Sequence, residues 1–146
     1  MPSLSGQCNP AVGPLVQMGV EPPAAPGVQI TPARFLQPIP APRLFSALVD
    51  TGASTTCISA AVVAAIGIPP AGLRQMGSAT QASVATNTYV VDLALVFVGI
   101  NWWFPGVLVF EYVPSPNAGH QMLLGRDIIC QGAFTLHSDG HFSFSI

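Results

Sequence analysis

The sequence contains no lysine, and its 146 residues include only four arginines, six acidic residues and three cysteines. With a formal net charge of −2 and no cluster of basic residues, the chain lacks the positive patch that binds nucleic acid or an anionic membrane surface. We therefore expect neither as a partner. Half of the residues are hydrophobic and 7% are charged, a balance that leaves apolar surface to cover and favours self-association.

Disulfide and metal sites are also poorly supported. Cys8, Cys57 and Cys130 are odd in number and form no CxxC pair, so we expect reduced, mostly buried thiols in a cytoplasmic protein. His137 and His141 flank a predicted hairpin turn, and no further ligand has a suitable spacing. We predict neither a metal ion nor another cofactor.

No segment has the character of a membrane span. The first residues lack the basic region and the continuous apolar run of a signal peptide. The most apolar segment, residues 93–110, is interrupted by Gly99, Pro105 and Gly106. Its β-branched and aromatic residues predict a hairpin.

The length predicts one domain with a substantial core. Ten of the fifteen prolines lie in the first 42 residues, and residues 21–42 should form an extended loop that is neither helix nor central strand. Residues 15–21 before it predict a first strand. We divide the chain into residues 1–43, a first strand and a Pro-rich loop belonging to the domain, and residues 44–146, the core.

The core reads as short strands with one short helix. The helix is expected over residues 58–68, where alanines and an apolar face end at Gly67 and a Pro-Pro pair. The expected strands and turns are a strand at 44–50, two strands within 74–98, a turn at 99–103, a strand at 106–113, a strand and helical turn at 122–132, and a hairpin at 133–146. This pattern predicts a small, mostly β, barrel-like domain.

Asp50 is one of the six acidic residues, and it directly follows the apolar strand at 44–49. A carboxylate there costs free energy unless it is paired or hydrogen-bonded. Gly52 allows a tight turn in which backbone N–H groups hold the carboxylate. Two facing carboxylates that share one proton can hydrolyse a peptide bond by acid–base catalysis. Because the chain has a single Asp-Thr-Gly, a two-fold dimer would supply the second aspartate.

The motif "ALVDTGAS", followed further along the chain by "LLGRDII", resembles the retropepsin-like aspartic proteases. The resemblance covers residues 44–136, with residues 15–21 as the first strand. It implies a small, closed, β-barrel-like acid protease fold with one or two short helices, which functions as a two-fold homodimer on a polypeptide substrate. The alanine-rich, lysine-free composition favours a bacterial source.

The resemblance implies roles for the first motif. Asp50 corresponds to the catalytic aspartate, and Thr51 to the threonine whose hydroxyl reaches the matching loop of the partner subunit. Gly52 corresponds to the glycine whose backbone borders the substrate, with Ala53 beside it. Because Ala53 lacks a hydroxyl that could favour the charged carboxylate, we expect activity to be best at roughly pH 4–6.

The second motif and a hairpin complete the expected site. Leu124 and Gly125 resemble the segment that passes beside the catalytic loop, Arg126 begins the family's helical turn, and Asp127 should cap or pair locally. The hairpin after the helix corresponds to the flap that closes over bound peptide. Its expected substrate-binding residues near the tip are Gln81, Ala82, Ser83 and Val84.

The chain departs from the family pattern in three places. The expected flap tip has no glycine, which raises the alternative of a catalytically silent dimerisation or peptide-binding module. Ser54 and Thr55 replace an acidic residue that pairs with the later arginine, so Arg126 needs Asp127 or a backbone carbonyl instead. The C-terminal arm, with Phe142, Phe144 and Ile146, could interleave with a partner or fold back onto its own chain.

Overall fold

The structure is a computed structural model that describes residues 2–28, 31–78 and 81–146. Its strands are β1 (Ser3–Gln7), β2 (Leu15–Glu21), β3 (Leu44–Val49), β4 (Cys57–Ser59), β5 (Gly72–Ser78), β6 (Gln81–Phe97), β7 (Ile100–Tyr112), β8 (Met122–Leu124), β9 (Ala133–Leu136) and β10 (His141–Ser145). The helical elements are α1 (Pro32–Leu36), the 3-10 turn η1 (Ala41–Arg43), α2 (Ala60–Ile66) and α3 (Arg126–Ile129).

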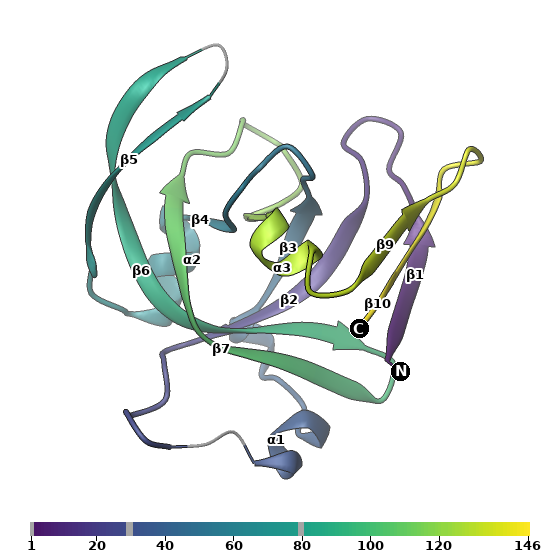
Figure 1. Cartoon of the computed structure of the whole chain (residues 1–146), viewed down its shortest axis with the longest axis horizontal. Coiled ribbons are helices and arrows are strands. Elements are labelled where there is room, and N and C mark those ends of the chain that lie inside the picture. Colours follow the sequence, from purple (N-terminus) through teal and green to yellow (C-terminus); the bar gives the residue numbers. More distant parts are fainter. Residues whose placement is uncertain (1, 29–30, 79–80) are drawn as a thin grey trace.

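A closed barrel forms the body of the molecule (Figure 1). Within the described ranges, one sheet has the order β2-β3-β8-β4-β7-β6-β5, and a further pairing of β2 with β6 closes it. β3 runs parallel to β8, whereas β4 runs antiparallel to β8 and parallel to β7. The predicted fold class, a mostly β barrel-like domain with short helices, is confirmed. β2 pairs with β3 and with β6, so residues 15–21 are part of the barrel.

The barrel interior is filled by apolar side chains from strands that are far apart in sequence. Met18, Leu93, Leu95 and Met122 are completely buried there. α2 adds Val62 and Ile66 to this core, because residues four apart share one face of a helix. The helix was predicted to begin at residue 58, but α2 begins at Ala60 because residues 57–59 belong to β4.

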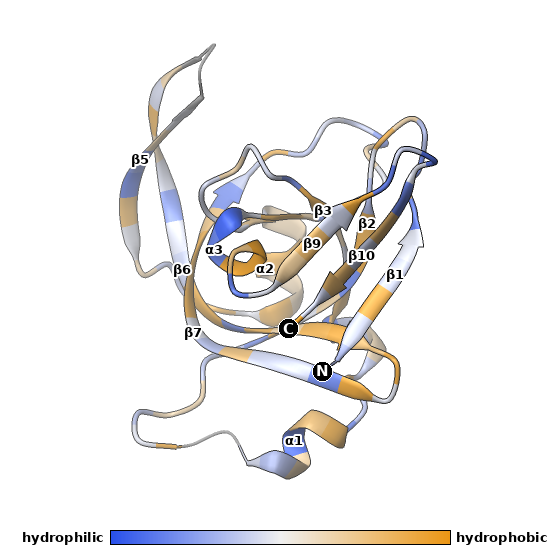
Figure 2. Cartoon of the chain, turned by 45° about the vertical axis from the view of Figure 1, so that its right-hand side comes forward, coloured by the Kyte–Doolittle hydropathy of each residue, from blue (hydrophilic) through white to orange (hydrophobic). Residues whose placement is uncertain are grey.

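The hairpin of β5 and β6 extends from the barrel as a two-stranded arm (Figure 1). Most of its described residues are exposed, and hydrophilic stretches lie between hydrophobic ones along it (Figure 2). Ser78 pairs with Gln81 at the far end of the described part of the arm. The hairpin predicted from the sequence is therefore present, and residues 81–84, expected near its tip, belong to β6.

The two ends of the chain lie side by side (Figure 1). β1 pairs with β10, which also pairs with β9. Phe142 and Phe144 of β10 are only 2% and 3% exposed and pack on the chain's own core. The C-terminal arm thus folds back, which was one of the two alternatives, and its partner strand β1 was not predicted.

The Pro-rich segment contains helical turns, contrary to expectation. Pro32 stands at the start of α1, where the missing N–H of proline is harmless and its fixed φ suits a helix. α1 packs against β7, with Phe35 edge-on to Trp102 at a centroid distance of 5.2 Å.

The turn between β6 and β7 consists of Val98 and Gly99 alone. Residues 100–103, which were predicted as part of the turn, therefore belong to β7.

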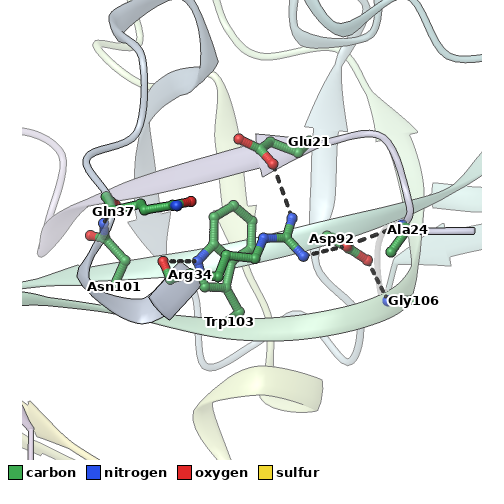
Figure 3. A network of polar contacts seen from close by, with 8 residues as sticks. All are labelled: Glu21, Ala24, Arg34, Gln37, Asp92, Asn101, Trp103 and Gly106. Carbon is green, nitrogen blue, oxygen red and sulfur yellow. Dashed lines mark hydrogen bonds and ion pairs between the residues drawn. The ribbon is translucent and has the colours of Figure 1, made fainter. Parts of the chain in front are cut away.

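Polar contacts around Arg34, called here the Arg34 cluster, attach the Pro-rich segment to the barrel (Figure 3). The Arg34 guanidinium lies 2.9 Å from a Glu21 carboxylate oxygen and 3.0 Å from an Asp92 oxygen. It also sits over the Trp103 ring, 3.8 Å from the centroid. Because Asp92 is only 1% exposed, its charge needs this partner.

Replacing Arg34 by methionine should lower the free energy of unfolding by about 3 kcal/mol, because it leaves a buried carboxylate without its cation. Asp92 would keep the backbone N–H groups of Ala24 and Gly106, at 3.2 and 2.9 Å. Urea denaturation measures the loss. Arg74→Met, on an exposed residue, is the control and should change stability by no more than about 0.5 kcal/mol. Equal effects of both variants would contradict the assignment.

Candidate active site

Asp50 begins a tight loop at the end of β3. Its backbone N–H donates to the Leu124 carbonyl at 3.0 Å, and the Ala53 N–H donates to the Asp50 carbonyl at 3.2 Å. The Gly52 N–H donates to Asp50 Oδ1 at 2.9 Å. The carboxylate is therefore held by the loop's own backbone, as an aspartate commonly is in such a turn. Thr51 is exposed.

Two hydrogen bonds from Arg126, one from its backbone and one from its side chain, join the β8–α3 segment to this loop. The Arg126 N–H donates to the Ala53 carbonyl at 2.9 Å, and the Arg126 guanidinium donates to the Thr51 carbonyl at 3.2 Å. A backbone carbonyl was one of the two partners expected for this arginine. Gly125 packs against the Thr55–Thr56 peptide, where a side chain would overlap backbone atoms.

Thr56 and Asp127 connect the two segments from inside. The Thr56 hydroxyl donates to Asp127 Oδ1 at 2.8 Å and accepts from the Gly125 N–H at 3.1 Å. The Thr56 N–H donates to Asp127 Oδ2 at 3.1 Å. Asp127 also accepts the Ile128 N–H at 3.0 Å, so it pairs locally as expected and joins the Asp50 loop to α3.

Thr56 is 0% exposed, so its hydroxyl cannot be replaced by solvent. Thr56→Val should lower the free energy of unfolding by about 2 kcal/mol, because the Gly125 N–H loses its acceptor and Asp127 Oδ1 loses one of its two donors. Thr56→Ser keeps the hydroxyl and should lose less. Urea denaturation compares the two variants; a serine variant that is less stable than the valine variant would contradict this role.

A cleft of about 790 Å³ lies between the Asp50 loop and the hairpin arm. Its lining residues are Asp50, Gly52, Ala53, Ser54, Thr55, Cys57, Met76, Gly77, Val84, Ala85, Thr86, Glu111, Tyr112, Val113 and Leu123. None of the described residues of the Pro-rich segment is among them.

The cleft brings together only part of the expected substrate-binding set. Ala53 and Val84 line it, together with Asp50 and Gly52. Ala82 and Ser83 are exposed and stand outside the lining, because they lie further along the hairpin. The Gln81 side chain lies outside the described residues.

Glu111 and Tyr112 are among the polar cleft residues that the sequence analysis did not identify. Glu111 and Tyr112 end β7 and face the cleft. The Tyr112 hydroxyl lies 3.0 Å from His120 Nδ1, and burial raises the pKa of Tyr112 above its usual range. Glu111 is one of only six acidic residues in the chain, and it comes directly after an apolar run, as Asp50 does. An acidic residue in that position is a sequence signal that could have identified Glu111.

Cys57 lines the cleft but is a poor nucleophile. Burial, followed by the charges of Asp127 and Asp50, raises the pKa of the Cys57 thiol to about 11. Since only a thiolate is nucleophilic, Cys57 is inert near neutral pH. The expectation of mostly buried thiols was wrong for Cys8, which is partly buried, and for Cys130, which is exposed.

Iodoacetamide at pH 8 should therefore modify Cys130 rapidly and leave Cys57 intact, because about one Cys57 thiol in a thousand is ionised at that pH. Mass spectrometry of proteolytic fragments measures the two rates. The alkylated protein should keep whatever activity the unmodified protein has. Rapid modification of Cys57 in the folded chain would contradict the raised pKa.

In the described part of the chain, no group of three or more His, Cys, Asp or Glu side chains is placed to hold a metal ion. No helix in the same residues has the length and apolar character needed to cross a membrane.

The chain is similar to known proteins in its fold and in its family pattern. No curated protein sequence matches the chain. The fold is similar to a crystal structure of a retropepsin-like aspartic protease from Rickettsia conorii, with a TM-score of 0.62 and 11% identity over 97% of this chain and 88% of that one. The model of the family described as "gag-polyprotein putative aspartyl protease" matches residues 43–131. Because this match covers more than half of the chain, the chain belongs to this family of retropepsin-like aspartic proteases.

Proposed function

We propose that the chain is an aspartic endopeptidase that works as a homodimer, with one Asp50 from each subunit. The observation that carries the proposal is the position of Asp50, at the end of a barrel strand, held by the Gly52 N–H and lining the cleft. One chain supplies one such aspartate, so a two-fold axis beside the loop would supply the facing carboxylate.

The proposed reaction uses two carboxylates that share one proton. The ionised carboxylate removes a proton from a water molecule, and the water oxygen attacks the scissile carbonyl carbon. The protonated carboxyl group gives its proton to the carbonyl oxygen. The tetrahedral intermediate then collapses: the C–N bond breaks, the leaving nitrogen takes a proton, and the carboxyl product forms. No covalent intermediate and no metal ion are needed.

The residues around Asp50 would position the partner subunit and the substrate peptide. The exposed Thr51 hydroxyl would contact the partner subunit's matching loop, and the Gly52 backbone would border the substrate. Leu124, Gly125, Arg126 and Asp127 would support the loop from behind. The β5–β6 arm, with Val84 in the cleft, would act as the flap and bind the substrate as an added extended strand.

The test is cleavage of a peptide library by purified protein over a range of pH that includes about pH 5, the middle of the range of roughly pH 4–6 expected from the sequence. Activity should fall at lower pH, where both carboxyl groups are protonated, and at higher pH, where both are ionised. Specific activity should also fall on dilution, as dimers dissociate. Absence of cleavage by folded protein at any pH would favour the alternative of a silent peptide-binding module.

A further inference from the structure

The cleft contains a second acidic residue and no basic one. Of the residues that line it, Asp50 and Glu111 carry carboxylates, and none is an arginine or lysine. Among the described residues, the ion pairs are those of Arg34 with Glu21 and Asp92, on the Pro-rich segment. Glu111 thus faces the cleft with its negative charge unneutralised by an ion pair in the described residues.

Glu111 is held in place by β6. The Tyr89 hydroxyl donates to Glu111 Oε1 at 2.9 Å, and the Thr86 hydroxyl donates to the Glu111 carbonyl at 2.9 Å. Tyr89 is only 3% exposed. Burial, and then the hydrogen bond to Glu111, raise the pKa of Tyr89, so the phenol stays neutral and continues to donate. A neutral donor fixes the carboxylate without cancelling its charge.

We propose that Glu111 is a specificity residue that binds a lysine or arginine side chain of the substrate peptide. This inference rests on the proposed function. A carboxylate with one oxygen fixed by Tyr89 offers its remaining lone pairs to an ammonium or guanidinium group. An acidic substrate side chain would instead meet a like charge in a partly enclosed cleft, which disfavours its binding.

The sheet order places this subsite away from the scissile bond. β3, which leads to Asp50, is followed across the sheet by β8, β4 and then β7, which carries Glu111. Three strand spacings amount to about 14 Å across the sheet, and the register places Glu111 level with Ala47, three residues before Asp50. The two displacements combine to about 17 Å, the length of about five residues of extended peptide. The basic residue should therefore lie within about five residues of the scissile bond. In a two-fold dimer Glu111 occurs twice, so the preference should appear on both sides of that bond.

The test begins with the cleavage profile of the peptide library and continues with a preferred peptide made in three forms, with lysine, norleucine or glutamate at the enriched position. Wild type should cleave the lysine form about fivefold faster than the norleucine form, the factor expected of a solvent-accessible ion pair, and the glutamate form most slowly. Glu111→Gln should remove the difference between lysine and norleucine. Tyr89→Phe should reduce it, because Glu111 loses its positioning donor.

Asp139→Asn is the matched control, since it removes one negative charge from an exposed residue outside the cleft and should leave the ratio unchanged. An unchanged ratio in Glu111→Gln would overturn the inference while leaving the protease function intact. If wild type cleaves nothing, the proposed function fails separately, and binding of three labelled peptide pools decides the inference, each pool carrying one lysine, norleucine or glutamate in an otherwise uncharged random sequence. Asp50→Asn protein should bind the lysine pool most tightly, and equal affinities with and without Glu111→Gln would overturn the inference.

Discussion

Asp50→Asn should reduce peptide-bond hydrolysis by about 10³-fold or more, the effect expected when a catalytic acid–base group is removed. Asparagine has nearly the same shape as aspartate, and its side-chain oxygen can still accept the Gly52 N–H that Asp50 accepts at 2.9 Å. The loop should therefore keep its conformation while the dimer loses both ionisable groups. Initial rates on a fluorogenic peptide at about pH 5 measure the loss.

The matched control replaces Asp139 by asparagine on the exposed β9–β10 turn, and it should keep wild-type activity. Thermal melting of both variants verifies that they are folded. If Asp50→Asn retained a tenth or more of the wild-type rate, Asp50 would not be the catalytic group. Hydrolysis lost equally in both variants would point to net charge as the cause.

Gly125→Ala should lower the free energy of unfolding by about 3 kcal/mol or more, a large part of the stability of a domain of this size. The added methyl group would lie 2.6 Å from the Thr55 carbonyl oxygen and 2.8 Å from the Thr56 nitrogen. These are backbone atoms, which cannot rotate away as the end of a side chain can. The backbone of Gly125, with φ −88° and ψ 177°, is open to any residue, so the effect is purely steric.

Gly72→Ala is the control, because a Cβ at Gly72 meets nothing within 4 Å. It should change stability by less than about 1 kcal/mol. Urea denaturation compares the two variants with wild type. Because Arg126, next to Gly125, donates to the Ala53 carbonyl, any folded Gly125→Ala protein should also lose activity. Equal stability of the two alanine variants would show that the packing of Gly125 on the Thr55–Thr56 peptide is unimportant.

Those parts of the fold that depend on local pattern were predictable from the sequence. The apolar run of β3 ending at Asp50, the helix α2 ending at Gly67 in the left-handed conformation, and the β9–β10 hairpin are each determined by neighbours in sequence. Hydrophobic periodicity and turn residues carry that information, and the structure places all three close to their expected ranges.

Elements that depend on distant partners were missed. β1 is short and mostly small or polar, and it forms a strand because β10, at the other end of the chain, pairs with it. α1 sits among prolines that argue against a helix, yet its packing on β7 and the Arg34 cluster fix it there. In both cases tertiary contacts override local preference.

The candidate site divides in the same way. Asp50, Gly52 and the Gly125–Asp127 segment belong to two short motifs and could be identified from the sequence. Thr56 and Glu111 have no motif of their own; their roles arise from hydrogen bonds to Asp127 and Tyr89 across the barrel. Side-chain pairing of that kind follows from strand register, which the sequence alone does not specify.

The most direct test of the central claim, that each active site takes one Asp50 from each of two subunits, is a subunit-mixing titration. Wild-type protein at a fixed concentration, at which the chain sediments as a dimer, is equilibrated with increasing amounts of Asp50→Asn protein, and peptide cleavage is measured. With random pairing, an equal amount of the variant should lower the rate to about half, and a ninefold excess to about a tenth. A rate that stays constant up to the ninefold excess would contradict the shared site and show that one chain is active by itself.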